Sequence, residues 1–493
     1  MHRVLDYQFR RTSLLIVACV GVLIGLGLAR CGVSATPAMA AICLGLCIFI
    51  APYRNLVSVL LVLFAAIVFG LWRGAEYKQA VSQYYTLYDK TITLRVTALT
   101  DATYNKSKQL SFDANNVSYN DQRLVGKITV SGFGLNAIYF GDELEVHGKL
   151  RTTLGAAQGR MSFAQLQLVR HHPSLIGDIR RNFAVGMQNA LPEPVDAFAM
   201  GLLVGQRATL PSDIKESLLM VGLTHIIAVS GYNLTIILRA SKRLLASRSK
   251  RLSTLLSLSL IVIFLLITGF SASIVRAAIV STLSIYSSYY GRTFKPLLLI
   301  LLVAAGTTMV NPNYLWNDAG WYLSFLAFGG VMILSPLLAE KLPRKLQSST
   351  IVMIAVESLA AEMATLPYLL HTFGQMSFVG LLANTLIAAF IPLAMLLSAI
   401  AGLAGMLAAS VAGWVAWPAT LLLTYMLDTA QLLSRGPHVF QKNLSLNGTA
   451  TLECYAVVVF VWAVPYFKKR GKAGILTDKN SSLVPLQERM HIV

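Results

Sequence analysis

The sequence predicts a polytopic α-helical membrane protein of about 12 spans, with a small all-β domain inserted after the first spans. Of its 493 residues 55% are hydrophobic and only 13% are charged, and the mean hydropathy is +0.63. Apolar runs of about 18 residues or more recur, which is the length a helix needs to cross a bilayer. Between residues 85 and 172 the apolar period changes from helical to two, as in β-strands.

Residues 1–75 are expected to hold three membrane helices, near 13–30, 34–50 and 56–72. No clear small-residue cleavage site follows the first apolar run, so we interpret that run as a span and not as a cleaved signal peptide.

Residues 85–172 are expected to form a separate barrel domain. Ile92, Leu94 and Val96 alternate with polar residues, as a strand with one buried face requires. Further strands are predicted at 109–120, 124–133, 142–151 and 162–171. Five short strands separated by turn signals favour a small closed barrel of the OB type.

The rest of the chain divides into three parts. Residues 174–222 are predicted to form amphipathic helices at the membrane surface. Residues 223–467 are expected to form nine further spans, of which the penultimate is long and can be broken at Pro418, and 468–493 a cytoplasmic tail.

Charge predicts the orientation. The formal net charge of +19 comes from clusters of Lys and Arg between the predicted spans, which the positive-inside rule places in the cytoplasm. Twelve spans with both termini cytoplasmic put five such clusters on one side, and they put the β domain outside. Net charge alone does not establish a polyanionic partner.

Polar groups inside apolar segments are the first candidates for a functional site, because they are costly in lipid unless they face protein or water. In the segment HIIAVSGYNL, residues 225–234, we predict that His225, Ser230 and Asn233 form a polar arc and that Gly231 breaks the helix. A broken helix end can face a cavity. The alternative is an interhelical hydrogen-bond cluster.

A second stripe lies at residues 268–288, where Arg276 and Ser281 share one helix face. An arginine at this depth needs water, a carboxylate or an anionic ligand. Close packing through small residues is the alternative account of the serines.

Two acidic regions are expected to balance charge. Glu357 and Glu362 share an arc of the predicted helix at 350–370, and we favour neutralisation of Arg276 over a proton relay. Pro367 frees a backbone carbonyl one turn earlier, and Asn384 is expected to act in packing. In the aromatic outer loop at 311–325, an interfacial belt leaves Asp318 and Ser324 unexplained.

The barrel domain carries basic and aromatic side chains of the kinds that hold single-stranded nucleic acid, although core packing is the simpler account of any one aromatic. The basic candidates are Lys106, Lys108, Arg123, Lys127, Lys149 and Arg151.

Taken in order, these segments resemble the ComEC competence-protein family. The resemblance rests on residues 202–234, TGFSASIVRAAI at 268–279, the loop at 311–325 and TLPYLLHTFGQMSFVGLLAN at 365–384. It implies a membrane channel that passes single-stranded DNA inward, with His225, Ser230, Gly231, Asn233, Arg276 and Ser281 lining or gating the path.

Many members of the family end in a zinc-dependent domain thought to degrade the other strand. The eight histidines show no His-x-His-x-Asp-His cluster, so no metal, cofactor or enzymatic activity is expected. Expected partners are single-stranded DNA, the bilayer, a separate nuclease, a DNA receptor and a cytoplasmic motor. The alternatives are a proton-coupled transporter of a small anionic solute and an intramembrane hydrolase using Ser230.

Overall fold

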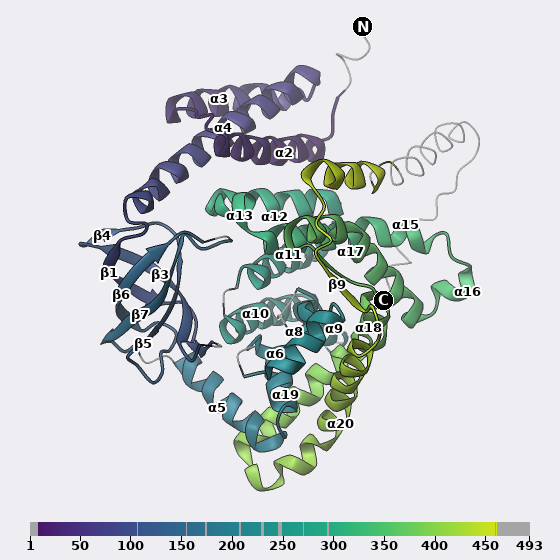
Figure 1. Cartoon of the computed structure of the whole chain (residues 1–493). Coiled ribbons are helices and arrows are strands. Elements are labelled where there is room, and N and C mark those ends of the chain that lie inside the picture. Colours follow the sequence, from purple (N-terminus) through teal and green to yellow (C-terminus); the bar gives the residue numbers. More distant parts are fainter. Residues whose placement is uncertain are drawn as a thin grey trace.

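The computed structural model describes residues 8–458 and 460, except 106, 154, 173–174, 207–208, 228–230, 245–248, 270 and 293–294. Figure 1 shows three parts: a layer of N-terminal helices, a β-barrel at one side, and a larger helical domain.

The N-terminal layer consists of α2 (Arg11–Arg30), α3 (Pro37–Ile50) and α4 (Leu56–Ser82). Small residues let α2 and α4 approach closely: a Cβ on Gly70 would lie 2.5 Å from the carbonyl oxygen of Val22 and 3.1 Å from the Cα of Gly25. Glycines spaced four apart, Gly21 and Gly25 on α2 and Gly70 and Gly74 on α4, are typical of helix pairs in membranes.

The small barrel predicted from period-two alternation is confirmed. Its strands are β1 (Thr91–Ala98), β2 (Thr103–Tyr104), β3 (Leu110–Tyr119), β4 (Gln122–Arg123), β5 (Ile128–Phe133), β6 (Glu143–Arg151) and β7 (Gly159–Arg170). The five long strands close in the order β1-β6-β7-β5-β3, with β3 pairing back to β1. Only β5 and β7 run parallel among the paired strands described.

The barrel is fixed to α4 without a flexible linker. Tyr77 and Val81 of α4, and Tyr84 in the 3-10 turn Gln83–Thr86, belong to the same buried cluster as the inward side chains of the strands. The Tyr77 hydroxyl accepts a hydrogen bond of 2.6 Å from Nε2 of Gln158, and Tyr88 donates to the Gln158 carbonyl oxygen at 2.6 Å. Burial raises the pKa of Tyr88, which keeps this hydroxyl a donor.

Three helices follow the barrel: α5 (Leu175–Ala190), α6 (Val195–Val204) and α7 (Ser212–Met220). The prediction that 174–222 lies at the membrane surface is wrong for α6, in which every residue except Leu203 is buried. The physical reason is that α6 is apolar on all sides apart from Asp196 in its first turn, so it belongs in a core and not at an interface.

The first helices of the larger domain are α8 (Thr224–Ile227), α9 (Gly231–Leu244), α10 (Lys250–Thr268), α11 (Ala272–Tyr289), α12 (Pro296–Val310) and α13 (Asn313–Asn317). Next come α14 (Ala319–Gly329), a π-helical turn at Gly330–Leu334, α15 (Ser335–Ala339), α16 (Arg344–Gln347) and α17 (Thr350–Phe373). The last are β8 (Gln375–Ser377), α18 (Gly380–Ala388), α19 (Ile391–Leu407), α20 (Ala409–Ser434) and β9 (Phe440–Lys442). A further helix starts at residue 448.

The protein is a multi-pass membrane protein. Within the described residues, six helices are long and apolar enough to span a bilayer, or seven when the α18–α19 pair, bent by 53°, counts as one. The count of twelve stays a prediction. The helix break expected at Pro418 is not there: Pro418 lies inside α20, and the chain instead breaks at Ala408.

Candidate functional site

The segment from Asn311 to Asn317 joins all three parts of the molecule. The Trp316 indole donates to the Leu26 carbonyl oxygen on α2 at 2.9 Å, and its ring meets that of Tyr77 edge-on at 5.6 Å. Nδ2 of Asn313 donates to the Ala156 carbonyl oxygen in the barrel at 3.0 Å. Trp316 therefore packs inside the protein, where the sequence suggested only an interfacial belt.

Arg276 on α11 lies directly beside this junction. Its side chain is buried, with 5% exposed, and its guanidinium points at the first turns of α14. Nη2 donates to the Gly320 carbonyl oxygen at 3.1 Å, and Nε donates to Oγ of Ser324 at 3.4 Å. Nη1 is buried and has no hydrogen-bond partner in the structure.

Asp318 supplies the negative charge near Arg276 and interacts with it electrostatically. The same carboxylate caps α14, because its Oδ1 accepts from the Gly320 backbone N–H at 2.9 Å. Asp318 and Ser324, which a belt of aromatics left unexplained, thus lie around the buried arginine.

The two glutamates have other neighbours. Glu357 interacts electrostatically with Arg239 of α9. Glu362 lies next to α18, with Oε1 3.7 Å from the position of a Cβ on Gly380. We expected these carboxylates to neutralise Arg276, but the contacts of Arg276 come from α14. This partner was not predicted, because periodicity shows which face of a helix a residue lies on but not which other helix that face contacts.

His225 takes part in a second polar network, which connects α8, α18 and α17. Its Nδ1 lies 3.1 Å from the Gly222 carbonyl oxygen, and its ring also hydrogen-bonds the side chain of Asn384. Nδ2 of Asn384 donates to Oγ of Ser358 at 2.6 Å. His225 is exposed, and Oγ of Ser377 nearby is buried without a partner.

The prediction that Gly231 breaks the helix stays a prediction, because residues 228–230, just before the start of α9 at Gly231, lie outside the described residues. Ser230 lies outside the described residues. A Cβ on Gly231 would lie 2.9 Å from Cβ of Ala277, so this glycine also permits close packing against α11 beside Arg276.

The other predicted polar residues of the helices act mainly between helices. Asn233 is buried and donates to the Leu202 carbonyl oxygen at 2.9 Å. Ser281 is half-buried on α11. Pro367 lies inside an unbroken α17, where Tyr455 donates to the neighbouring Ala364 carbonyl oxygen at 3.2 Å.

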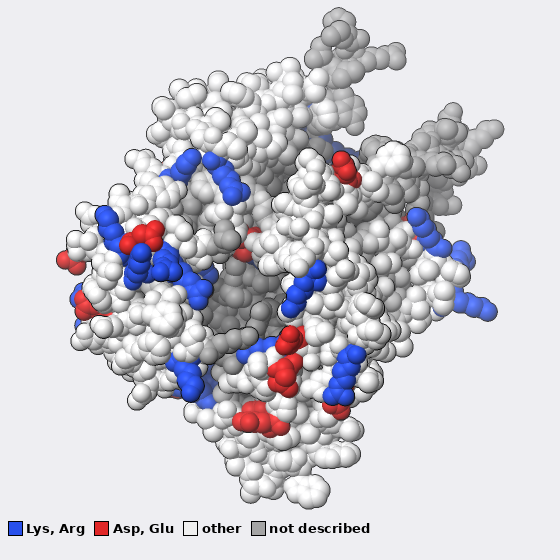
Figure 2. Space-filling model, viewed as in Figure 1, with Lys and Arg blue, Asp and Glu red and all other residues white. Residues whose placement is uncertain are grey.

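On the barrel, Lys108, Arg123, Lys149 and Arg151 are exposed, and Lys106 lies outside the described residues. Lys127 is half-buried and paired with Asp113 at 2.9 Å. Arg95 and Arg160 are also exposed on the barrel but were not among the predicted basic candidates. Their outward positions in alternating strands are the sequence signal that could have identified them. Figure 2 shows Lys and Arg side chains on the barrel part of this face.

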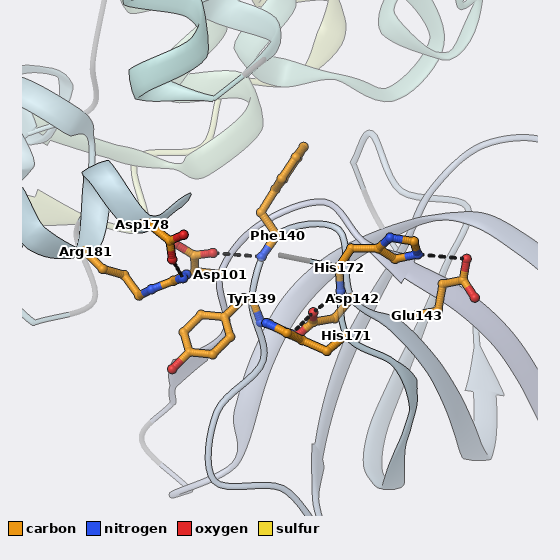
Figure 3. A network of polar contacts seen from close by, with 9 residues as sticks. All are labelled: Asp101, Tyr139, Phe140, Asp142, Glu143, His171, His172, Asp178 and Arg181. Atoms are coloured by element: carbon orange, nitrogen blue, oxygen red, sulfur yellow. Dashed lines mark hydrogen bonds and ion pairs between the residues drawn. The ribbon is translucent and has the colours of Figure 1, made fainter. Parts of the chain in front are cut away.

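A third polar network, also missed, joins the barrel to α5 (Figure 3). The buried carboxylate of Asp142 accepts from the Tyr139 backbone N–H at 2.8 Å and lies 2.7 Å from Nδ1 of His171. Across the joint, the Arg181 guanidinium stacks over the Tyr139 ring at 4.3 Å, and Arg180 lies 3.9 Å from Asp101. Turn residues of this kind have no periodic signal, so sequence alone did not group them.

In the described part of the chain, no group of three or more His, Cys, Asp or Glu side chains is placed to hold a metal ion.

Comparison with known proteins locates these sites within a family. The model of the family described as "Competence protein" matches residues 202–468, which contain the Arg276 and His225 networks. The chain is 27% identical over 228 residues to ComE operon protein 3 of Bacillus subtilis (strain 168), which is 45% of this chain and 28% of that protein. The chain therefore matches less than a third of this relative's length. No solved structure matches significantly.

Proposed function

Because the chain belongs to the competence-protein family, we propose that it is a channel that passes single-stranded DNA across the bacterial cytoplasmic membrane during DNA uptake. The observation that carries this proposal is the fixed attachment of the barrel to the region around Arg276. Asn313 binds the barrel, and Asp318, five residues later, holds Arg276. A strand held on the barrel would therefore arrive next to Arg276, a buried cation whose contacts link α11 to α14.

The barrel would receive the strand outside the membrane. Its five long strands and its parallel β5–β7 pair support an OB-type barrel, a fold that commonly binds single strands. Lys106, Lys108, Arg123, Lys127, Lys149 and Arg151 remain the basic residues proposed to contact phosphates.

The helical domain would conduct the strand. Asn233 and Arg276 are buried in this structure, so a conducting state requires α9 or α11 to move. We assign lining or gating of the path to the residues of the α8–α9 segment and of α11, namely His225, Ser230, Gly231, Asn233, Arg276 and Ser281. Asp318, Ser324, Glu357, Glu362, Pro367 and Asn384 would hold that geometry.

The proposed topology has twelve spans, both termini in the cytoplasm and the barrel outside. The pairing of β8 with β9 supports it, because paired strands lie on one side of a membrane and residues 378–439 must then cross an even number of times. A separate nuclease would degrade the other strand, a receptor would capture the DNA, and a cytoplasmic motor would pull the transported strand inward.

Uptake of labelled DNA in cells with and without this protein tests the function. Loss of internalised label, with surface-bound label unchanged, is the expected result.

The second candidate is a transporter of a small anionic solute, which the unpartnered Nη1 of Arg276 favours. Equal DNA uptake in both strains would favour that transporter and exclude the DNA channel.

A further inference from the structure

Two phenylalanine rings lie exposed next to each other on the outer surface of the barrel. Phe133 ends β5 and is 47% exposed, and Phe163 on β7 is 71% exposed. Their ring centroids are 6.4 Å apart and the rings are tilted by 45°. Core packing does not explain this pair, because most of the surface of Phe163 faces away from the barrel interior.

A β-bulge in β7 is what turns Phe163 outward. Along β5 the partners of Val130 and Gly132 are Met161 and Ala164, so β7 contains one extra residue. The same extra residue appears against β6, where Leu150 and His147 face Met161 and Gln165. Met161 and Ala164 are both buried, and the residues between them are displaced to the surface.

The backbone at this bulge is unusual for an aromatic residue. Phe163 has a φ of 57°, in the left-handed region that bulky side chains seldom adopt. Bulges re-aim side chains, and uncommon backbone conformations persist where the surrounding structure imposes them. Here the strands on both sides impose it, and the result is one exposed ring placed beside another.

Basic side chains are exposed on β7 and on the neighbouring strand β6. Arg160 is three residues before Phe163 and is paired across the sheet with Arg151. Both arginines and Lys149 are exposed on the same pair of strands, β6 and β7. Lys149 lies 3.4 Å from Asp89, whereas the ion pairs found among the described residues include neither Arg151 nor Arg160.

We propose that Phe133 and Phe163 form a stacking platform for the bases of a single DNA strand, and that Arg151, Arg160 and Lys149 bind its phosphates. This proposal rests on the proposed function and adds the site at which the barrel recognises its substrate. Rings that stack on bases select single strands, since bases in a duplex already stack on one another. The adjoining positive charge complements the phosphate backbone of a nucleic acid.

The experiment compares two oligonucleotides on the full-length protein in detergent: fluorescent oligothymidine and an abasic oligonucleotide of the same length. The wild type should bind oligothymidine more tightly. Phe163→Ala and Phe133→Ala should each weaken oligothymidine binding by roughly tenfold and leave abasic binding unchanged, because only base stacking is lost. Phe163→Tyr should restore the wild-type preference.

Two controls separate the possible failures. Val169→Ala, an exposed apolar residue on the same strand, should change neither affinity. Arg160→Ala should weaken both oligonucleotides and reduce the salt dependence. If Phe133→Ala and Phe163→Ala keep the wild-type preference for bases, the stacking platform is wrong and any DNA bound contacts another part of the protein. If the wild type binds neither oligonucleotide at low salt, the part of the barrel in the proposed function fails as well.

Discussion

Gly186 on α5 and Gly402 on α19 approach so closely that a Cβ on Gly186 would lie 2.6 Å from the Gly402 carbonyl oxygen. The Phe183 ring, one turn earlier on α5, covers Gly402. Because α5 follows the barrel in sequence and α19 lies in the core of the helical domain, this crossing adds a fixed attachment between the two parts to the junction at Asn313 and Trp316.

We expect Gly186→Ala to destabilise the protein by about 1–3 kcal/mol, because the new methyl group meets backbone that cannot turn aside. Thermal unfolding in detergent, followed by intrinsic fluorescence, measures this. The matched control is Gly413→Ala in α20, where no atom lies within 4 Å of the added Cβ. That control should be neutral or stabilising by about 0.5–1 kcal/mol, as for an exposed helix position. Equal effects of both changes would mean that the α5–α19 contact is not tight.

Arg276→Ala and Arg276→Lys should both reduce DNA uptake by at least about tenfold while the protein still inserts. Lysine keeps the charge but cannot bond Gly320 and Ser324 at once, since its ammonium lacks the fork of a guanidinium. Uptake of labelled DNA and the amount of protein in the membrane fraction are measured together. Arg292→Ala, at an exposed position beyond the same helix, is the control. Normal uptake by Arg276→Ala would remove this residue from the path.

Asp142→Ala should loosen the joint between the barrel and α5. The buried carboxylate accepts from the Tyr139 N–H and contacts His171, and its removal leaves buried polar groups unpaired at a cost of about 1–3 kcal/mol. Hydrogen exchange should quicken at residues 139–143 and 171–172. Asp121→Ala, in an exposed turn of the same barrel, should leave exchange there unchanged. Unchanged exchange in Asp142→Ala would show that other contacts hold the joint.

The barrel was predictable from sequence because each strand shows its own alternation of apolar and polar residues. The inward orientation of Leu94 and Val146 can therefore be read from neighbouring residues of the same strand. The helix caps at Ser249 on α10 and Asp318 on α14 are also local features, but they were not predicted, and Asp318 was left unexplained. Long-range partners were not predictable in this way. Arg276 was recognised as a buried charge, yet its contacts with Gly320 and Ser324 depend on how α11 packs against α14, and one sequence contains no signal for that packing.

The bulge at Phe163 was not predictable from the alternation either. One extra residue in β7 shifts the alternation, so a strict period of two does not predict that Met161 and Ala164 both face inward. The burial of α6 was likewise missed because charged residues, among them Asp196 in the first turn of α6, suggested an interface, whereas the other residues of α6 are apolar and pack in the core.

Topology is tested by labelling single cysteines in intact cells, after Cys31, which is exposed at the end of α2, is changed to Ser. Gln167→Cys on the barrel should react with a membrane-impermeant maleimide, because the barrel is proposed to lie outside. Lys250→Cys at the start of α10 should react only after the membrane is permeabilised. The reverse pattern would invert the orientation, and labelling of both in intact cells would show that the membrane was not sealed.

The last prediction concerns which basic residues of the barrel bind DNA. Lys127 already neutralises Asp113 at 2.9 Å, whereas Arg123 and Arg151 are exposed and take part in none of the ion pairs among the described residues. Binding of single strands releases counterions, so log affinity falls linearly with log salt by about 0.7 per phosphate contacted. Arg123→Ala and Arg151→Ala should each reduce that slope by up to this amount in titrations of a fluorescent oligonucleotide. Lys127→Ala should reduce it less, because the charge of Lys127 is already paired with Asp113 and contributes less to phosphate binding. A larger loss for Lys127→Ala than for both arginines would place the strand on the β3–β5 side of the barrel, next to the Lys127–Asp113 pair.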